Sequence, residues 1–231
     1  MSDDGVRVRC KILRGDLLLN TSNEATLHVD EDEGPPPSED WVYGSFGGDH
    51  GEGPSRAMLA QPWSVTFSCY FVNTPSNMQL VTHGSNFNTG ALANYWRVNI
   101  LGAGNLRVQL WENEDFQRTA TIQVPPPVGE WIDVEAGWTG SQLYCRAFGE
   151  EAITDISTMY LGPTESVYRV LNTGGNILGV QIRDIVIRED NNSFLVRWQC
   201  NEGSGVQMLD SSGGNFTGTL TSEDIHEIAR T

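Results

Sequence analysis

Two groups of closely spaced carboxylates in the sequence could support acid–base chemistry. One group is Glu112, Glu114 and Asp115 in "WENEDF", and the other is Asp133 and Glu135 in "DVE". Two carboxylates held at a fixed separation can cleave a glycosidic bond, one as general acid and the other as nucleophile or base. Asp133 and Glu135 are two residues apart, so on a strand they would share one face. Solvated strand ends explain both groups more simply, and we expect neither to be catalytic.

No other arrangement in the sequence matches a catalytic or cofactor-binding pattern. A Gly-x-Ser-x-Gly nucleophile elbow and a Walker phosphate loop are both missing. The motif "GAGN" at Gly102 indicates a hairpin turn, because no helix follows it that would bind a phosphate. The histidines are dispersed without metal-ligand spacing, at His28, His50, His83 and His226. We therefore expect a protein that is not an enzyme and has no cofactor.

The cysteines also argue against a metal site. None of the four forms a Cys-x-x-Cys pair, so zinc is not expected. Each lies in a strand-like run, at Cys10, Cys69, Cys145 and Cys200. We expect small apolar core residues at these positions. One or two disulfides are the alternative, and the sequence does not decide whether the thiols are bridged.

Composition and charge exclude several classes of protein. The 231 residues are 39% hydrophobic, which is enough for a sizeable core, and the 25 glycines and 10 prolines indicate many turns. A formal net charge of −16 repels phosphate backbones, so nucleic acid is not an expected partner. No apolar run approaches the roughly 20 residues of a membrane span. The start, "MSDDGVRVRC", has no signal-peptide pattern, so we expect no export by the usual route unless a signal lies outside this sequence.

Short runs of alternating polarity recur along the chain and predict β-strands. In "WSVTFSCYF", residues 63–71, apolar residues alternate with serine and threonine, as in a half-buried strand. Residues 94–111, "NYWRVNILGAGNLRVQLW", form two such runs joined by a glycine-rich turn, which predicts a hairpin. The one candidate helix is short, in "TSEDIHEIA", residues 221–229, where Thr221 or Ser222 could cap it. Closely spaced strands with almost no helix are typical of a β-sandwich or barrel.

The predicted hairpin has one face that could bind a ligand. We expect its apolar side chains to point into the core, at Trp96, Val98, Ile100, Leu106, Val108 and Leu110. Their neighbours would then point outward, at Tyr95, Arg97, Asn99, Arg107, Gln109 and Trp111. Aromatic, arginine and amide side chains suit sugars, because rings stack on sugar faces and polar groups bond hydroxyls. They equally suit protein interfaces, and an ordinary polar face is the third possibility.

The order of these segments resembles the laminin-G-like branch of the concanavalin A-like lectin/glucanase superfamily. The resemblance lies in "AQPWSVTFSCYF", the hairpin of residues 94–111, "GEWIDVEAGWTGSQLYCRAFGEEA", "ILGVQIRDIVIRE" and "RWQCNEGSGVQMLDSSGGNFTGTL". It covers roughly residues 41–220. It implies an all-β, antiparallel jelly-roll sandwich over residues 36–231, with residues 1–35 as a short N-terminal β extension or docking segment.

The resemblance implies that the last of these segments, residues 197–220, has a structural role. Four glycines permit tight turns, at Gly203, Gly205, Gly213 and Gly214. Asp210 and Ser211 are expected to hydrogen-bond the local backbone. A calcium loop that uses Asp210 is the alternative, and calcium is the only metal we consider possible.

The resemblance also bears on function. Retaining glucanases of this superfamily carry Glu-x-Asp-x-x-Glu or Glu-x-Asp-x-Glu on one strand, and neither motif is present. Related domains occur in bacteriophage structural proteins, which implies a virion surface component, such as a decoration, collar or tail-fibre protein, that is homo-oligomeric or bound to other virion proteins. In this role "GVRVRCKIL" could add a strand to a neighbour, or it could pair within its own sandwich. The second reading is a glycan-binding, lectin-like module that is extracellular or at a cell surface, and the third is a glycoside hydrolase.

Overall fold

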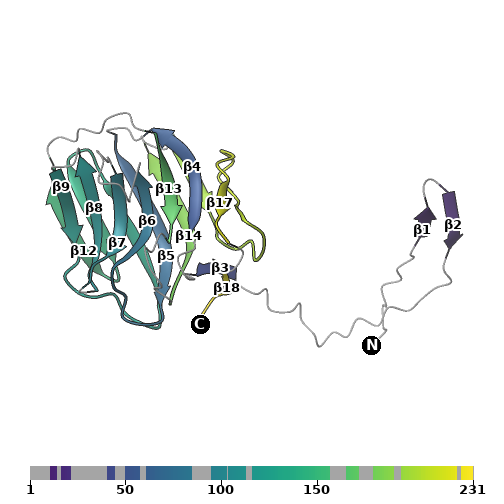
Figure 1. The fold of residues 1–231 in the computed structure, drawn as a ribbon, viewed down its shortest axis with the longest axis horizontal. Coiled ribbons are helices and arrows are strands. Elements are labelled where there is room, and N and C mark those ends of the chain that lie inside the picture. The colour runs from purple at the N-terminus through teal and green to yellow at the C-terminus, as the bar shows by residue number, and fades with distance from the viewer. Residues whose placement is uncertain are drawn as a thin grey trace, which may run out of the picture. The chain divides into compact units, whose positions relative to one another are not determined.

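The computed structural model of the chain (Figure 1) contains two compact units, Met1–Glu39 and Asp40–Thr231. The structure describes residues 11–14, 17–21, 41–44, 50–57, 61–84, 95–102, 104–112, 116–156, 165–171, 179–189, 194–222 and 225–230. In the N-terminal unit, β1 (Lys11–Arg14) pairs antiparallel with β2 (Leu17–Thr21). Of the predicted docking segment "GVRVRCKIL", residues 5–13, the described residues 11–13 pair with β2, and residues 5–10 lie outside the described part.

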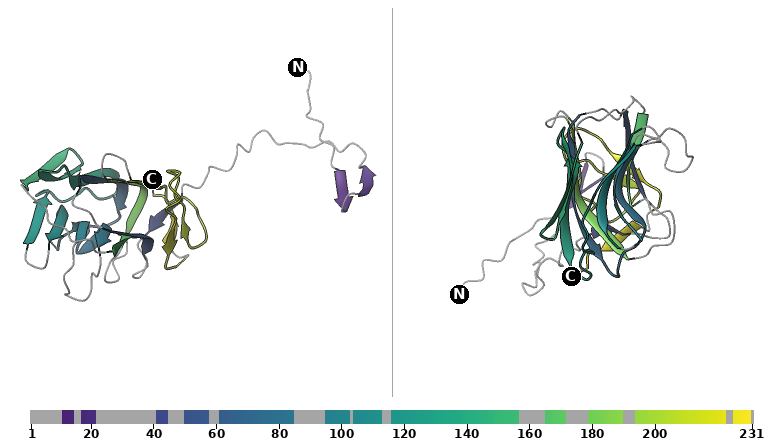
Figure 2. Two further views of the ribbon diagram at one scale, coloured as in Figure 1. Left: turned by 90° about the horizontal axis from the view of Figure 1, so that it is seen from above. Right: turned by 90° about the vertical axis from the view of Figure 1, so that its left-hand side faces the viewer.

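The larger unit is a sandwich of two antiparallel sheets, seen edge-on in the right-hand view of Figure 2. The first sheet has the strand order β12 (Glu150–Asp155), β11 (Gln142–Ala147), β10 (Trp131–Trp138), β5 (Trp63–Phe71), β14 (Val180–Glu189), β3 (Trp41–Gly44) and β18 (His226–Ile228), with β15 (Phe194–Trp198) also paired to β14. The second has the order β16 (Gln207–Met208), β17 (Gly218–Leu220), β4 (Gly51–Ala57), β13 (Glu165–Val170), β6 (Met78–Gly84), β7 (Tyr95–Ile100), β8 (Leu106–Glu112) and β9 (Phe116–Thr121). The predicted all-β jelly-roll sandwich is confirmed.

The core lies between the sheets and is built from the alternation seen in the sequence. On β5, the apolar positions Trp63, Val65, Phe67, Cys69 and Phe71 are all buried, while the serines and threonine between them are partly exposed. Trp63 stacks on Trp96 of β7, with ring centroids 4.3 Å apart, so the two sheets contact each other through aromatic rings. None of the described segments forms a helix with the length and apolar character that a membrane crossing requires.

The predicted helix in residues 221–229 is wrong. Residues His226–Ile228 form β18, which pairs with β3 in the register His226↔Tyr43 and Ile228↔Trp41. A helix of fewer than about 12 residues is marginal in water, because its nucleation cost is barely recovered. Pairing with β3 instead satisfies backbone groups that this strand would otherwise leave open. Residues 223–224 lie outside the described part.

Three of the four cysteines occupy the core as predicted. Cys69, Cys145 and Cys200 are free thiols and none is exposed. Burial is the main cause that raises the pKa of each thiol, to about 12 for Cys145. Disulfides among these three are therefore excluded, and Cys10 lies outside the described residues.

The segment of residues 197–220 is held together by Asp210. Its Oδ1 accepts hydrogen bonds from the backbone N–H groups of Arg197 (3.0 Å) and Ser212 (2.9 Å). Its Oδ2 accepts bonds from the Ser212 hydroxyl (2.8 Å) and the Phe216 N–H (2.9 Å). The Ser211 hydroxyl donates to the Arg197 carbonyl at 3.3 Å. The predicted local backbone bonding by Asp210 and Ser211 is confirmed.

Candidate functional site

The pairing of β7 with β8 brings all six predicted binding residues onto the outer face of the second sheet. Strand register places them in three adjacent pairs, Tyr95↔Trp111, Arg97↔Gln109 and Asn99↔Arg107. The six apolar residues between them are at most 1% exposed, so they face the core as predicted. We call these three pairs the β7–β8 ladder.

An aromatic pair forms one end of the ladder. The rings of Tyr95 and Trp111 are stacked, with centroids 5.6 Å apart and planes 26° apart. Both side chains are half-buried. The Arg97 guanidinium carbon lies 5.4 Å from the centre of the Tyr95 ring, within cation–π range. Burial raises the pKa of Tyr95, although Arg97 and Arg107 act in the opposite direction, so the phenol stays neutral.

Amide groups hold the two arginines of the ladder. Arg97 Nε donates to Gln109 Oε1 at 2.7 Å, and Arg107 Nε donates to Asn99 Oδ1 at 3.1 Å. Asn99 and Gln109 are only 5% and 1% exposed. Asn99 and Gln109 lie on the predicted outer face, but they are covered by neighbouring side chains and hold the guanidinium groups in place.

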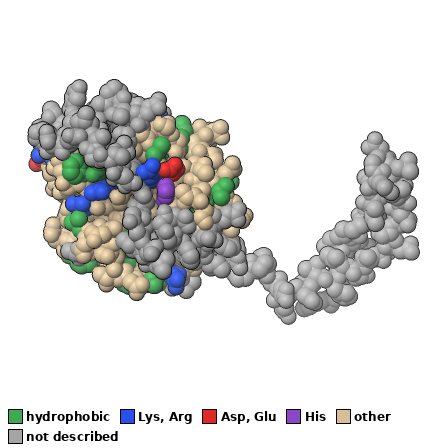
Figure 3. Space-filling view, viewed as in Figure 1, with side chains coloured by type: hydrophobic (Ala, Val, Ile, Leu, Met, Phe, Trp, Pro, Cys, Tyr) green, Lys and Arg blue, Asp and Glu red, His purple; other side chains and the backbone are tan. Residues whose placement is uncertain are grey.

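The ladder continues into a polar row across the sheet. Register places Thr82 beside Arg97 on one side and beside Arg169 on the other. Arg169 Nε donates to Glu52 Oε1 at 2.9 Å, and His50 Nε2 lies 3.4 Å from the same oxygen. Figure 3 shows this face. Basic side chains (blue) lie next to hydrophobic ones (green), and elsewhere on the face a basic side chain lies next to an acidic one (red) and a histidine (purple). The outer face of the second sheet thus presents aromatic and basic groups together, and the Thr82 hydroxyl is covered between Arg97 and Arg169.

The carboxylates considered for glycoside hydrolysis lie on the outer face of the first sheet. Asp133 and Glu135 line an open groove of about 670 Å³, together with Glu150, Glu151 and Asp184. Asp133 Oδ1 accepts a hydrogen bond of 2.6 Å from the Ser68 hydroxyl.

Glu135 is also occupied by neighbouring side chains. It accepts a bond of 3.1 Å from the Tyr144 hydroxyl and lies 3.6 Å from the Arg146 guanidinium. Glu114, Asp115 and the side chain of Glu112 fall outside the described residues. The described members of the two carboxylate groups are therefore engaged in ordinary contacts along strands.

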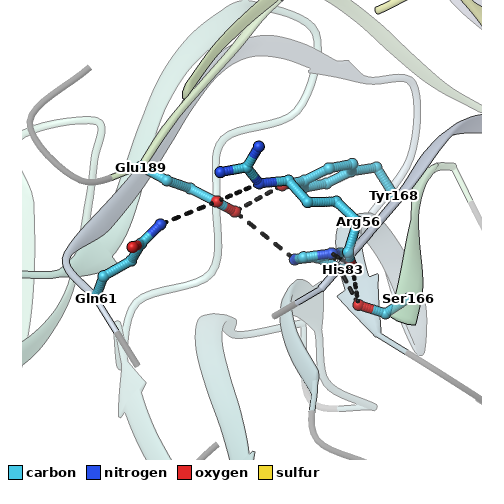
Figure 4. Close-up of polar contacts among 6 residues, drawn as sticks. All are labelled: Arg56, Gln61, His83, Ser166, Tyr168 and Glu189. Carbon is cyan, nitrogen blue, oxygen red and sulfur yellow. Dashed lines mark hydrogen bonds and ion pairs between the residues drawn. The ribbon is translucent and has the colours of Figure 1, made fainter. Parts of the chain in front are cut away.

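A buried polar cluster between the sheets, shown in Figure 4, was not predicted from the sequence. The Ser166 hydroxyl lies 2.9 Å from His83 Nε2, and His83 Nδ1 lies 3.9 Å from Glu189 Oε1. This order of groups is that of a nucleophile, a base and an orienting acid. However, the three residues are 3%, 0% and 5% exposed, so a substrate cannot contact the hydroxyl. Burial lowers the pKa of His83 to about 3, and the ring is neutral.

Glu189 is the centre of this cluster. It accepts hydrogen bonds from the Tyr168 hydroxyl (2.6 Å), Arg56 Nε (3.0 Å) and Gln61 Nε2 (3.4 Å). These donors satisfy both carboxylate oxygens of the buried side chain. The alternation of "IVIRE" could have revealed it, because Glu189 follows Ile185 and Ile187 on the same inward face of β14.

The chain is similar to several solved structures. No protein-family model matches the sequence, and no curated protein matches it. Similar solved structures include a pentraxin from Limulus polyphemus, with 12% identity, a TM-score of 0.45 and coverage of 64% of this chain and 76% of the pentraxin. They also include the sialyllactose-bound CBM40 of a Ruminococcus gnavus sialidase, with 15% identity, a TM-score of 0.42 and coverage of 59% of this chain and 89% of that one.

The mouse laminin α1 LG4-5 domains are a third similar structure. Their identity to this chain is 14% and their TM-score is 0.46, with coverage of 72% of this chain and 48% of the laminin chain. The antiparallel β-sandwich predicted for this chain is carried by its own strand pairing. At these scores no residue role is transferred to this chain.

Proposed function

We propose that this protein is a non-catalytic binding protein that holds carbohydrate on the β7–β8 ladder. The observation that carries the proposal is the stacked pair of Tyr95 and Trp111, at 5.6 Å, on an outer sheet face beside two arginines. Aromatic rings stack against the apolar faces of sugars, and guanidinium groups donate hydrogen bonds to their hydroxyls. The ladder supplies both kinds of group within three rows of one sheet.

The described residues support a catalytic function less well than a binding function. The Ser166–His83–Glu189 group is buried, and Asp133 and Glu135 are bonded to Ser68, Tyr144 and Arg146. Glycoside hydrolysis requires one carboxylic acid kept protonated and a second carboxylate free to attack. Asp133 and Glu135 already contact neighbouring side chains, so neither stands free to attack a substrate.

A polysaccharide and glycan array tests the proposal. We expect the full chain to bind a defined subset of carbohydrates, and we expect Trp111→Ala to weaken that binding at least tenfold. Trp131→Ala is the matched control, because Trp131 is a half-buried tryptophan on the outer face of the other sheet. Circular dichroism would show that both variants fold. Equal binding by the wild type and Trp111→Ala would sink this assignment of the site.

The separate N-terminal unit favours a second role in assembly. Residues 1–39 form their own compact unit with the β1–β2 hairpin, and "VRVRCK" alternates apolar and basic residues. Such a segment suits strand addition to a second copy or to another particle protein. This role fits a position on a virion surface, which the family resemblance implies. Size-exclusion chromatography with light scattering on a variant lacking residues 1–35 tests it, and an unchanged oligomeric state would count against assembly through this unit.

A further inference from the structure

We propose that the carbohydrate bound by the β7–β8 ladder is anionic, and that Arg97 and Arg107 bind its carboxylate or sulfate groups. The inference rests on the proposed carbohydrate-binding function and adds the chemical class of the ligand. It predicts binding of acidic polysaccharides by a protein whose own net charge is −16.

The first argument is that Arg97 and Arg107 lack charged partners. Their hydrogen bonds go to the neutral amides of Gln109 and Asn99, and within the described residues neither contacts a carboxylate. Other arginines of the described part do have acidic partners, in the pairs Arg56–Glu189, Arg146–Glu151, Arg169–Glu52 and Arg183–Asp184. In a chain with 30 acidic residues, the β7–β8 ladder thus holds two adjacent guanidinium groups that no described carboxylate neutralises.

The second argument is that both charges are partly removed from water. Burial lowers the pKa of Arg97, and burial together with the positive charge of Arg97 lowers the pKa of Arg107. Desolvated like charges destabilise a protein unless an opposite charge approaches them. A bound anion would neutralise both groups at once.

The third argument is that the guanidinium groups are already oriented for an anion. The bonds to Gln109 and Asn99 use only the Nε–H of each arginine. The four Nη–H donors of each group stay outside these bonds, and they match the planar oxygens of a carboxylate or sulfate. Because the supporting amides are buried, little side-chain freedom is lost when the ligand binds.

Several polar atoms on the same face are buried and have no hydrogen-bond partner in the described structure. Thr82, between Arg97 and Arg169, is 0% exposed, and its Oγ1 has no hydrogen-bond partner. Trp111 Nε1 and Gln79 Oε1 on this face are also buried and unpartnered. A buried polar group without a partner is costly, which is why native structures usually satisfy such groups.

The order of the rows matches a sugar that carries an acid group. Rows of one sheet face repeat about every 7 Å along a strand. The aromatic row of Tyr95 and Trp111 is followed by the row with Arg97 and then by the row with Arg107. A sugar ring on the aromatic pair would therefore place its own or a neighbouring acid group over the arginines.

Binding to polygalacturonate, to its fully methyl-esterified neutral form and to heparin tests the proposal, measured by calorimetry with the full chain. We expect the wild type to bind polygalacturonate or heparin at least tenfold more tightly than the neutral ester. The double variant Arg97→Gln/Arg107→Gln should lose at least tenfold of that affinity. Arg118→Gln/Arg197→Gln is the control of equal net charge, since both arginines lie outside the ladder and are exposed, and it should bind like the wild type.

The outcomes separate this inference from the proposed function. Binding of polygalacturonate alone would assign the arginines to carboxylates, and binding of heparin as well would assign them to either anion. Equal binding of the ester, or full binding by the ladder double variant, would overturn the anionic class while sugar binding through Trp111 still stood. If no carbohydrate on the array binds, both proposals fail.

A second measurement does not depend on the choice of polymer. Sodium sulfate should raise the unfolding temperature of the wild type and of the Arg118→Gln/Arg197→Gln control above the value in sodium chloride of equal ionic strength. The ladder double variant should show a smaller rise, because its specific anion site is gone. An equal rise in all three proteins would contradict an anion site at Arg97 and Arg107.

Discussion

Tyr168 on β13 donates a hydrogen bond of 2.6 Å to Glu189 on β14, and the two strands belong to opposite sheets of the sandwich. Both residues are buried, with exposures of 0% and 5%. The Tyr168 ring also stacks on His83, with centroids 3.9 Å apart. β13 pairs with β6, which in turn pairs with β7, so this bond lies two strands from the ladder. This hydrogen bond therefore joins the sheet that presents the candidate site to the opposite sheet.

Removing either partner of this bond should destabilise the protein. We expect Tyr168→Phe to lower the free energy of unfolding by about 1–3 kcal/mol, because the buried Glu189 carboxylate would lose one of its hydrogen-bond donors. Glu189→Gln should cost at least as much, since Arg56 would lose its acidic partner. Urea unfolding of both single variants and the double variant would give the coupling energy. Additive effects in this cycle would show that the two side chains do not act together.

The buried His83 should make stability depend on pH. Burial lowers its folded pKa to about 3, whereas an unfolded histidine titrates near 6.5. Between these values the unfolded chain binds a proton that the folded chain does not. The free energy of unfolding should therefore be independent of this histidine above about pH 6.5. Below that pH it should fall by up to about 1.4 kcal/mol per pH unit. Urea unfolding from pH 7 to pH 5 would measure the slope, and a folded His83→Gln variant with the same slope would contradict this origin.

The fold could be predicted largely because half-buried strands must alternate. The inward faces of β5, β7 and β8 followed from period two, since a polar residue on the wrong face would lose its contact with water. The helix assigned to residues 221–229 failed for a non-local reason. The open edge of β3 offers backbone partners to His226–Ile228, and β3 lies about 180 residues earlier in the chain.

The site was predictable only in part. Alternation placed Tyr95, Arg97 and Trp111 on one face, but it did not show that Asn99 and Gln109 are covered. Burial of an outer face depends on what neighbouring side chains lie over it, which no local pattern contains. The position of Thr82 beside Arg97 and Arg169 depends likewise on the strand order β13-β6-β7, which is set by the topology of the whole sheet.

The buried cysteines should be unreactive in the folded protein. The thiolate is the reactive form, and burial raises the pKa of Cys69, Cys145 and Cys200. In a Cys10→Ser variant, which removes the thiol outside the described residues, we expect negligible modification by a thiol-specific disulfide reagent at neutral pH. Urea should release three reactive thiols. Rapid modification of any of them without denaturant would show that the core opens readily.

Asp210 should stabilise the segment of residues 197–220 without a metal. Asp210→Ala removes the acceptor of four hydrogen bonds and leaves three backbone N–H groups without this acceptor. We therefore expect the free energy of unfolding, measured with urea, to fall by about 2–3 kcal/mol. Asp155→Ala is the control, because the exposed Asp155 accepts one side-chain bond, from Gln142, among the described residues. Burial alone would raise the pKa of Asp210, but the bonds from Phe216, Ser212 and Arg197 lower it overall.

The sign of this shift gives a second test of Asp210. Its stabilisation should be complete above about pH 4, where the unfolded carboxyl is ionised, and should fall as the pH drops through the lower folded pKa. A chelator should leave the unfolding temperature unchanged, because both carboxylate oxygens already accept protein N–H and O–H donors. A fall in unfolding temperature with chelator, restored by calcium and absent in Asp210→Ala, would instead assign Asp210 to a calcium loop.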